Sequence, residues 1–335
     1  MKQWKGTCRR LALTLVFIFI CLLSGCGTAG SGWAGKPAGD DRLRVVTTLF
    51  PYYDFVRQIA GDKVSLTLVI PAGMDSHSFE PTPADMRTIQ NADLLICNGG
   101  AMEQWLAQVL DAVEAGEDTV VMTMMDYVDA LEEELVEGME DGGENHRHEG
   151  EGHGHEAGTG YDEHIWTSPV NAMKMAGGIR DMLVEMDPAH EALYRQNGEA
   201  YLKQLQAIDE GFRQVSAGRK RDLIVVGDKF PFRYLAEEYG LEYRAAFSAC
   251  SADTEPSPRT IAYLIDKVKD ESIPAVYYLE LSSHRVSEII GEETGARPLL
   301  LHSCHNVTRA QFDAGITYVE LMTQNIENLR KGLDE

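Results

Sequence analysis

The stretch Val64-Ser-Leu-Thr-Leu-Val-Ile70 decides the fold, together with the helix and strand patterns that come after it along the chain. The run alternates apolar and polar residues and becomes continuously apolar at its end, which is typical of a strand entering a buried sheet. A loop leads from it to a helix expected to begin at Pro83, with Thr82 as its cap. A second apolar run, Ala92-Asp-Leu-Leu-Ile-Cys97, comes after this helix. Strand, helix and strand in this order predict a parallel sheet with a crossover helix.

The same alternation continues on both sides of this unit and builds two α/β lobes with parallel sheets. In a first lobe, residues 42–169, we expect further strands at 43–48 and 119–122 and helices at 53–60 and 102–113. A second lobe, residues 218–335, has the same character. Its expected strands are 223–226, 242–246, 275–279 and 298–301, and its expected helices are 231–239, 258–270, 284–294 and 312–331.

Two helical stretches, residues 170–186 and 188–217, lie between the lobes and form a linking segment at 170–217. The second stretch carries an apolar face whose members recur at alternating spacings of four and three: Tyr201, Leu205, Ile208, Phe212 and Val215. A helix of about 30 residues spans roughly 45 Å. We interpret it as a long rigid helix that joins the two lobes.

The first 25 residues predict a lipoprotein signal peptide. Basic residues precede an apolar run at 11–23 that is too short for a comfortable transmembrane helix, which needs about 20 apolar residues. Leu23-Ser-Gly-Cys26 resembles a bacterial lipoprotein cleavage box, and this resemblance implies a lipid on Cys26; an ordinary signal peptide is the alternative. Residues 26–41 are typical of a flexible tether. We therefore expect an extracytoplasmic protein, anchored by lipid to the cell membrane on its periplasmic or outer face.

The formal net charge of −23 argues against nucleic acid as a partner, because a phosphate backbone requires clustered Lys and Arg. Much of this charge lies between Glu132 and Glu163, around a His-rich stretch at about 137–160. That stretch has almost no apolar residues and is predicted to be a disordered loop. Its histidines are candidates for weak, reversible zinc binding: His146, His148, His153 and His155. A solvated charged loop without a role in metal uptake is the alternative.

Three cysteines remain in the mature domain: Cys97, Cys250 and Cys304. Cys97 lies in an apolar run and is expected in the core. Cys250 and Cys304 are candidates for a disulfide in the oxidising setting that export implies. They are also candidate metal ligands, and the sequence leaves both alternatives open.

Two histidines stand in distinctive surroundings, Gly73-Met-Asp-Ser-His77-Ser-Phe-Glu-Pro-Thr-Pro83 and Tyr161-Asp-Glu-His164-Ile-Trp-Thr-Ser-Pro169. His77 comes after a strand and before a helix, so we expect it at the carboxyl edge of the first sheet, where open α/β sheets place their ligands. Neutral imidazole is the commonest ligand for zinc and its first-row neighbours. The pattern therefore indicates that the protein handles a transition metal.

Both segments resemble those that hold the metal in the receptors of bacterial zinc and manganese ABC importers. Residues 91–105 are similar to the family's next strand, turn and helix, and residues 312–329 to its closing helix. The resemblance covers nearly all of the mature chain. It implies two α/β lobes joined by one rigid helix, a metal site in the cleft between them with ligands at His77 and His164, and delivery of the metal to a membrane permease with its ATPase.

The second lobe departs from the family's pattern. The family usually has a His or Glu just before a Phe-x-Tyr helix start, where this chain has Lys229, and a protonated lysine has no lone pair to offer. Asp228 is a substitute one residue earlier. Where the family usually has an Asp after the last strand, this chain has His302, which is the expected third ligand. The lesser candidates are Glu280, His305, Cys250 and Cys304.

Three imidazoles, with an oxygen atom as fourth ligand or an open fourth position, favour zinc, whereas a manganese site typically contains more carboxylate ligands. We therefore expect a monomeric, lipid-anchored Zn²⁺ receptor with no enzymatic activity. Its affinity should fall below a pH of about 6, because ligand histidines must be neutral. A Mn²⁺ receptor or a metal-buffering adhesin is the alternative. An exported zinc hydrolase is disfavoured, because the sequence contains no His-Glu-x-x-His pair and no nucleophile elbow.

Overall fold

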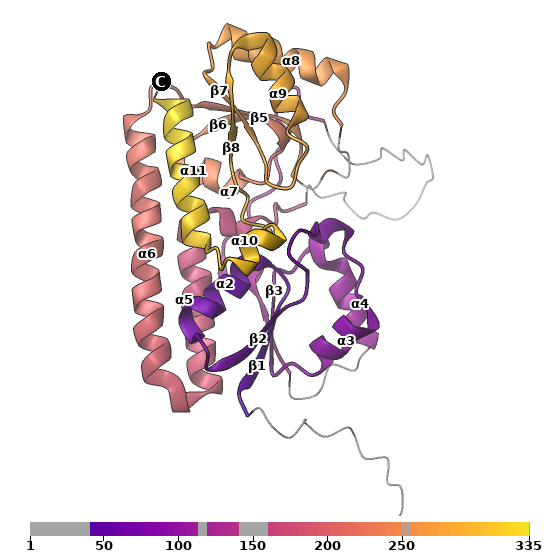
Figure 1. Ribbon diagram of the computed structural model, residues 1–335, viewed down its shortest axis with the longest axis vertical. Coiled ribbons are helices and arrows are strands. Elements are labelled where there is room, and N and C mark those ends of the chain that lie inside the picture. Colours follow the sequence, from indigo (N-terminus) through magenta and orange to yellow (C-terminus); the bar gives the residue numbers. More distant parts are fainter. Residues whose placement is uncertain (1–40, 113–118, 141–159, 250, 252–254, 335) are drawn as a thin grey trace, which may run out of the picture. The chain divides into compact units, whose positions relative to one another are not determined.

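The computed structural model describes residues 41–112, 119–140, 160–249, 251 and 255–334. Residues 42–335 form one compact unit, and its described part contains two four-stranded sheets, one in each lobe (Figure 1). The strand orders are β2-β1-β3-β4 and β6-β5-β7-β8. All neighbouring strands pair in parallel. The predicted α/β class with two lobes is thereby confirmed.

The strands of the first lobe are β1 (Leu43–Thr47), β2 (Val64–Leu68), β3 (Leu94–Cys97) and β4 (Val120–Thr123). Its helices are α2 (Phe50–Ala60), α3 (Pro83–Gln90) and α4 (Gln104–Ala112), with single turns at η1 (Ser76–Ser78), η2 (Ala101–Glu103), η3 (Met124–Tyr127) and η4 (Ile165–Thr167). α3 begins as predicted. The Thr82 hydroxyl accepts from the Asp85 amide while the Asp85 carboxylate accepts from the Thr82 amide, a capping box that fixes the start of the helix at Pro83.

The strands of the second lobe are β5 (Leu223–Lys229), β6 (Glu242–Phe247), β7 (Ala275–Tyr278) and β8 (Arg297–Leu300). Its helices are α7 (Arg233–Tyr239), α8 (Pro258–Asp270), α9 (Arg285–Thr294), α10 (Arg309–Asp313) and α11 (Tyr318–Leu333). The single helix expected at 312–331 is therefore two helices. Gly315 separates them with a φ of 77°, a left-handed conformation that ends α10 and that glycine adopts without a steric penalty.

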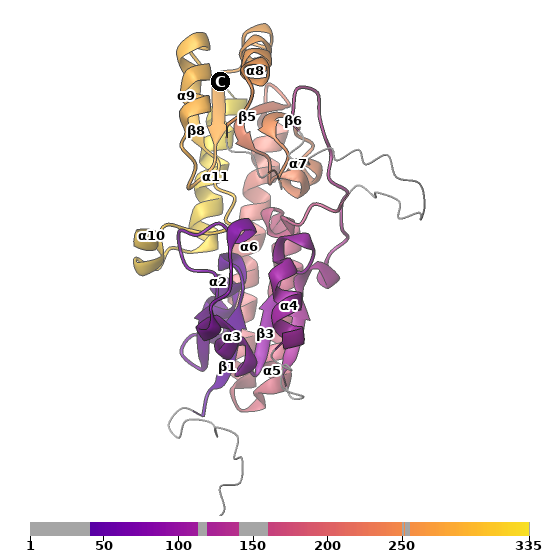
Figure 2. The same cartoon turned by 90° about the vertical axis from the view of Figure 1, so that its right-hand side faces the viewer.

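Two long helices connect the lobes: α5 (Pro169–Met186) and α6 (Glu191–Gly218), with the turn η5 (Pro188–His190) between them. α6 packs against α2 and α5 of the first lobe and against α7 and α11 of the second. Both views show α6 running past both sheets (Figures 1 and 2). A helix in contact with both lobes fixes them to one another along its length.

One hydrophobic core extends through both lobes. It joins Leu95 of the first sheet, Tyr201 of α6 and Tyr277 of the second sheet in a single cluster. In β5 the side chains alternate as a strand requires: Ile224 and Val226 enter this core, while Val225 enters a smaller core under α8 and α9. Separating the lobes would therefore expose apolar surface that is buried in this structure.

A segment of the first lobe, residues 131–140, crosses onto the second lobe, and we call it the strap. Its last residue, Glu140, lies beside the outer edge of β6. The Glu140 amide donates to Ala246 O at 3.0 Å, and the Ser248 amide donates to Glu140 O at 3.2 Å. The Glu140 carboxylate also accepts from the Ser257 amide at 2.9 Å, just before α8. The strap is thus bonded to the second sheet through its backbone and through its last side chain.

Candidate metal site between the lobes

A cavity of about 350 Å³ lies between the lobes. The first lobe contributes residues 73–75 and His164 to its wall. The second lobe contributes the end of β5, the loop after β7 and the loop after β8. These loops begin at the carboxyl ends of parallel strands, which is where open α/β sheets place their ligands.

His164 is held in place by its neighbour Asp162. Both side chains are 2 % exposed, and one Asp162 oxygen, Oδ1, accepts from the His164 amide at 2.8 Å and lies 3.1 Å from Nδ1 of the ring. A carboxylate at Nδ1 keeps the ring proton there, so Nε2 is the nitrogen through which His164 would bind a metal. The local sequence thus provides both the imidazole and the group that orients it.

The residue before His164 attaches its loop to η2, the turn that precedes α4. Both oxygens of the Glu163 carboxylate accept backbone N–H groups, one from Ala101 and one from Met102 at 2.6 Å. The Asn98 side chain donates to Glu163 O at 3.0 Å. Burial raises the pKa of Glu163, and the two backbone donors partly oppose that shift.

A second buried carboxylate, that of Glu103, closes the adjoining turn. Its Oε2 accepts from the amides of Asn98 and Gly99 at 2.9 and 3.0 Å. Burial raises the pKa of Glu103 to about 7. Gly99 and Gly100 both have a φ of 85°, which the sharp turn requires and which glycine adopts freely. Two carboxylates and two glycines therefore fix the backbone next to His164.

The opposite wall presents His305, in the loop after β8. Its Nε2 lies 2.5 Å from Ser76 Oγ of the first lobe. The ring centres of His305 and His164 are 5.8 Å apart, with their planes at 88°. Trp166 lies against both rings, at 5.4 Å from His164 and 5.3 Å from His305, and its Nε1 donates to Ser303 O at 2.8 Å. Two histidines from opposite lobes, one on each wall, thus come together in the cavity.

His302, the expected third ligand, lies behind this wall. It is 1 % exposed and does not line the cavity. Its Nδ1 accepts from the Cys304 amide at 2.9 Å, while Glu280 Oε1 lies 3.5 Å from the same nitrogen, too far for a good hydrogen bond. Burial lowers the pKa of His302, so the ring is neutral. Of the two histidines in this loop, the lesser candidate His305 is the one on the cavity.

Oxygen donors line the same cavity as the two histidines. Asp75, Asp228 and Glu280 all line the cavity, and so does Lys229. Asp228 Oδ1 accepts from the Lys229 amide at 2.9 Å. The pairing of β5 with β6 shifts register just before Lys229, and both Asp228 and Lys229 reach the cavity. The lysine that breaks the family's pattern is thus accompanied by a carboxylate on the same wall.

The cysteines take no part in the described site. Cys304 is a free thiol with no exposed surface, and Cys250, its partner in the disulfide suggested by the sequence, is not among the described residues. Burial raises the pKa of Cys304 well above its ordinary value, which keeps the thiol protonated and makes it a poor metal ligand. Cys97 is a buried thiol of the core, as expected. The remaining candidates lie outside the described residues: Cys26, Cys250, His146, His148, His153 and His155.

Among the side chains that the structure describes, no three His, Cys, Asp or Glu residues lie close enough together to hold a metal ion. For His77 only the backbone is described; it forms the middle of η1, two residues after the lining residue Asp75. The described part of the candidate site is therefore the pair His164 and His305, in a cavity that is also lined by carboxylates.

Sequence reasoning missed the groups that support the two histidines. Asp162 could have been found, because an acidic residue two positions before a histidine can reach its Nδ1. Trp166 and Ser303 could not, because they are 137 residues apart along the chain and meet only through the fold. Ser76 and His305 are 229 residues apart.

Comparisons with known proteins agree on one family. The family model described as zinc-uptake complex component A, periplasmic, matches residues 45–332. The high-affinity zinc uptake system protein ZnuA of Bacillus subtilis is 31% identical over 333 residues, which are 99% of this chain and 98% of that protein. The zinc-binding lipoprotein AdcA of Streptococcus pneumoniae is 31% identical over 318 residues, 95% of this chain but 61% of that longer protein. The crystal structure of the Zn(II)-bound ZnuA-like domain of pneumococcal AdcA superposes with a TM-score of 0.71 at 27% identity, covering 88% of this chain and 100% of that one.

Proposed function

This chain belongs to the family of periplasmic A components of zinc-uptake complexes, and from this premise we propose that it captures Zn²⁺ between its lobes and delivers it to an ABC importer. The observation that carries the proposal is the pair of imidazoles, His164 and His305, which meet at one cavity from opposite lobes. The partners of such a receptor are a membrane permease and its ATPase.

The geometry of this pair suits a tetrahedral metal. Two imidazoles on one zinc ion, with Zn–N bonds of about 2.0–2.1 Å, place their ring centres roughly 5 Å apart. The observed separation of 5.8 Å is within a small side-chain rotation of that arrangement. His305 Nε2, which meets Ser76 Oγ in this structure, would exchange that bond for the metal.

We assign the ligands to His77, His164 and His305, with a fourth oxygen ligand from the carboxylates that line the cavity. We include His77 because its segment resembles the ligand segment of the family. We choose His305 in place of His302 because His305 lines the cavity. A set dominated by nitrogen favours zinc over manganese. The His-rich stretch at about 137–160 would serve as an auxiliary, weaker store of the same ion.

The mature protein would be held outside the cytoplasm by a lipid on Cys26, as a monomer on a flexible tether. No helix among the described residues is long and apolar enough to cross a membrane. The tether proposed at 26–41 would let the receptor reach its permease from a fixed anchor.

Glu163 does not suit the role of general base in a zinc hydrolase. A catalytic zinc needs a general base next to its open position. Glu163, the carboxylate next to His164 in the chain, has both oxygens occupied by backbone N–H groups of the first lobe. A metal buffer or adhesin would use the same ligands without delivering the ion, so it differs from a receptor only in its partner.

The proposal is tested by a competition titration of Zn²⁺ against Mn²⁺ on the mature chain lacking residues 141–159. We expect one tight zinc site that manganese does not displace. His164→Ala and His305→Ala should each weaken zinc binding by at least about 100-fold, since a lost ligand costs more than a lost supporting group. His190→Ala is the matched control, because this histidine pairs with Asp187 at the start of α6 and does not line the cavity.

Three outcomes would contradict parts of this proposal. Displacement of zinc by manganese would make the protein a manganese receptor. Unchanged zinc affinity in both alanine variants would show that the cavity is not the metal-binding site. If the zinc-loaded protein failed to stimulate the ATPase of the reconstituted importer, the protein would be a buffer or adhesin.

A further inference from the structure

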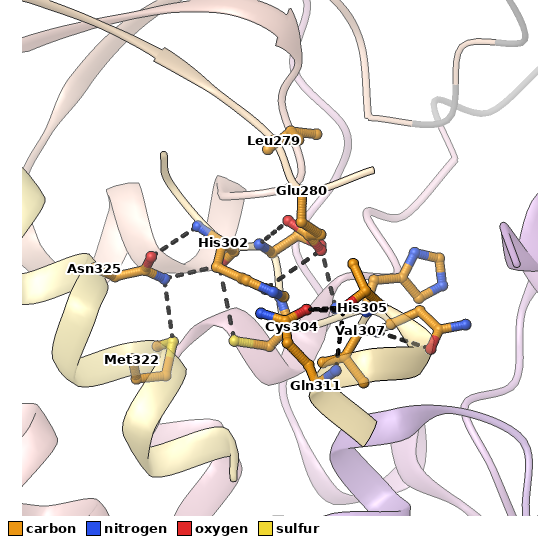
Figure 3. A network of polar contacts seen from close by, with 12 residues as sticks. Leu279, Glu280, His302, Cys304, His305, Val307, Gln311, Met322 and Asn325 are labelled. Carbon is orange, nitrogen blue, oxygen red and sulfur yellow. Dashed lines mark hydrogen bonds and ion pairs between the residues drawn. The ribbon is translucent and has the colours of Figure 1, made fainter. Parts of the chain in front are cut away.

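The loop that carries His305 is shaped by side chains. In the described residues, no backbone–backbone hydrogen bond involves residues 302–307. Side-chain atoms accept the loop's N–H groups instead (Figure 3). The pairs are His302 N to Asn325 Oδ1 at 2.7 Å, Ser303 N to Glu280 Oε2 at 2.7 Å, Cys304 N to His302 Nδ1 at 2.9 Å and His305 N to Ser303 Oγ at 3.1 Å.

His302 makes the central bond of this series with its ring. Its Nδ1 accepts the N–H of the residue two positions later, which is the connection that an asparagine side chain makes in an Asx-turn. The backbone of His302 is fixed at the same time, because Asn325 of α11 accepts from its N and donates to its O, both at 2.7 Å. The acceptor nitrogen is therefore anchored to a helix that contacts both α6 and the second sheet.

The bond to Nδ1 supports a conformation that the local sequence does not favour. Cys304 has a φ of 59°, in the left-handed region that residues with a Cβ seldom adopt. Its amide is buried, so without the His302 acceptor it would be left unsatisfied. The turn through Cys304 lies between Ser303, whose carbonyl meets Trp166, and His305, which meets Ser76.

We propose that His302 is a positioning residue for metal capture: its Nδ1 holds the left-handed turn at Cys304 and thereby places His305 at the cavity wall. This inference rests on the proposed zinc-binding function and adds to it a residue that touches neither the ion nor the cavity.

The positioning role and a ligand role for His302 exclude one another. A neutral histidine that binds a metal through Nε2 carries its proton on Nδ1 and donates it to a carboxylate or carbonyl. Such a ring could not accept the Cys304 N–H. The carboxylate in question, Glu280, already accepts from both the amide and the hydroxyl of Ser303. Nε2 has no hydrogen-bond partner among the described residues, so an experiment must separate the two roles.

Two substitutions in the mature full-length chain make this separation. His302→Asn keeps an acceptor at the same position but removes the imidazole, and His302→Leu removes both. Zn²⁺ affinity is measured by competition with a chelating dye, and the visible absorption spectrum of bound Co²⁺ reports the ligand set. We expect the asparagine variant to stay within about threefold of the unsubstituted protein with an unchanged cobalt spectrum, and the leucine variant to weaken by about 10- to 100-fold.

The proposal is overturned if the asparagine variant loses as much affinity as the leucine variant, or if its cobalt spectrum shows a lost nitrogen ligand. It is also overturned if the leucine variant binds normally. A failure of the proposed zinc function would be visible earlier, as absence of tight zinc binding in the unsubstituted protein.

Folding of each variant is followed by circular dichroism. If the leucine variant does not fold, the asparagine variant decides alone: retained affinity and spectrum support the proposal, and their loss overturns it. The double variant His302→Leu with Cys304→Gly provides a second test. Glycine adopts the left-handed conformation without a Cβ, so we expect it to restore part of the affinity that His302→Leu removes, and no recovery would count against the turn as the cause.

Discussion

The two walls of the cavity each hold one histidine, but they do so with different chemistry. Around His164 the supporting groups are carboxylates, namely Asp162, Glu163 and Glu103. Around His305 they are mostly neutral side chains, namely His302, Ser303 and Asn325, with Glu280 as the one carboxylate. The first wall depends on carboxyl groups that accept backbone N–H groups, and the second mostly on hydrogen bonds between neutral groups.

The walls also differ in backbone strain. In the described part of the first lobe and the strap, every left-handed position is a glycine: Gly61, Gly73, Gly99, Gly100 and Gly138. The left-handed residues other than glycine all lie in the described part of the second lobe: Ser272, Leu281, His284 and Cys304. Leu281 and His284 line the cavity, and Cys304 lies directly behind it. Such strain collects where a structure has to change or be held ready, so we expect the second wall to adjust on metal binding and the first to stay fixed.

The largest expected effect concerns the buried carboxyl group of Glu103 in the first wall. The pKa of Glu103 rises from its ordinary 4.5 to about 7 on folding, so folding favours the protonated carboxyl. Its contribution to stability is complete below a pH of about 4.5 and is lost as the pH rises through about 7, by up to roughly 3 kcal/mol. Glu103→Gln should flatten this part of the pH dependence of the unfolding free energy, measured in urea. The surface variant Glu237→Gln is the control, and an unchanged slope in Glu103→Gln would show that Glu103 is not the source of this pH dependence.

A smaller effect is expected from adding a methyl group to the fixed wall. At Gly100 a Cβ would clash with the Glu163 carboxyl group, and the φ of 85° is unfavourable for alanine. Gly100→Ala should cost about 2 kcal/mol of stability and weaken zinc binding by displacing the His164 loop. In the control Gly177→Ala, in α5, a Cβ meets nothing within 4 Å, and the change should be neutral or stabilising. If the two variants changed zinc affinity equally, displacement of the Glu163 carboxyl group would not be the cause of weaker binding in Gly100→Ala.

The smallest effect should come from relieving strain on the other wall. Leu281 is left-handed and 47 % exposed, so Leu281→Gly removes the steric cost of the conformation and little packing. The gain is offset by the larger entropy of glycine in the unfolded chain, and we expect a net stabilisation below about 1 kcal/mol. Thermal unfolding of the two proteins side by side measures it. A clear loss of stability would mean that this wall is not strained at Leu281.

The sequence predicts the fold well because strand alternation and helix caps are local. Thr82 and Pro83 are enough to predict the start of α3. The break between α10 and α11 depends on a single residue, Gly315, within a sequence pattern that predicts one continuous helix. Local signals of this kind survive in the fold because tertiary contacts reinforce them.

The candidate site was predictable on one wall only. His164 stands in a segment whose neighbours also orient it, so its role can be inferred locally. The choice between His302 and His305 depends on a left-handed turn at Cys304, which no periodicity in the sequence reveals. The place of Lys229 likewise depends on the register shift near the end of β5. Irregular backbone is where counting residues fails to tell which side chain faces a cavity.

The strap also matters for how the protein behaves at high concentration. β6 is an outer strand of the second sheet, and an uncovered strand edge is a template for pairing with other chains. Glu140 covers part of that edge through its backbone. A shortened receptor that begins its deletion at residue 137 would lose this cover and become prone to aggregation, whereas one that begins at residue 141 keeps it. We therefore expect a deletion that includes Glu140 to raise the tendency of the protein to self-associate.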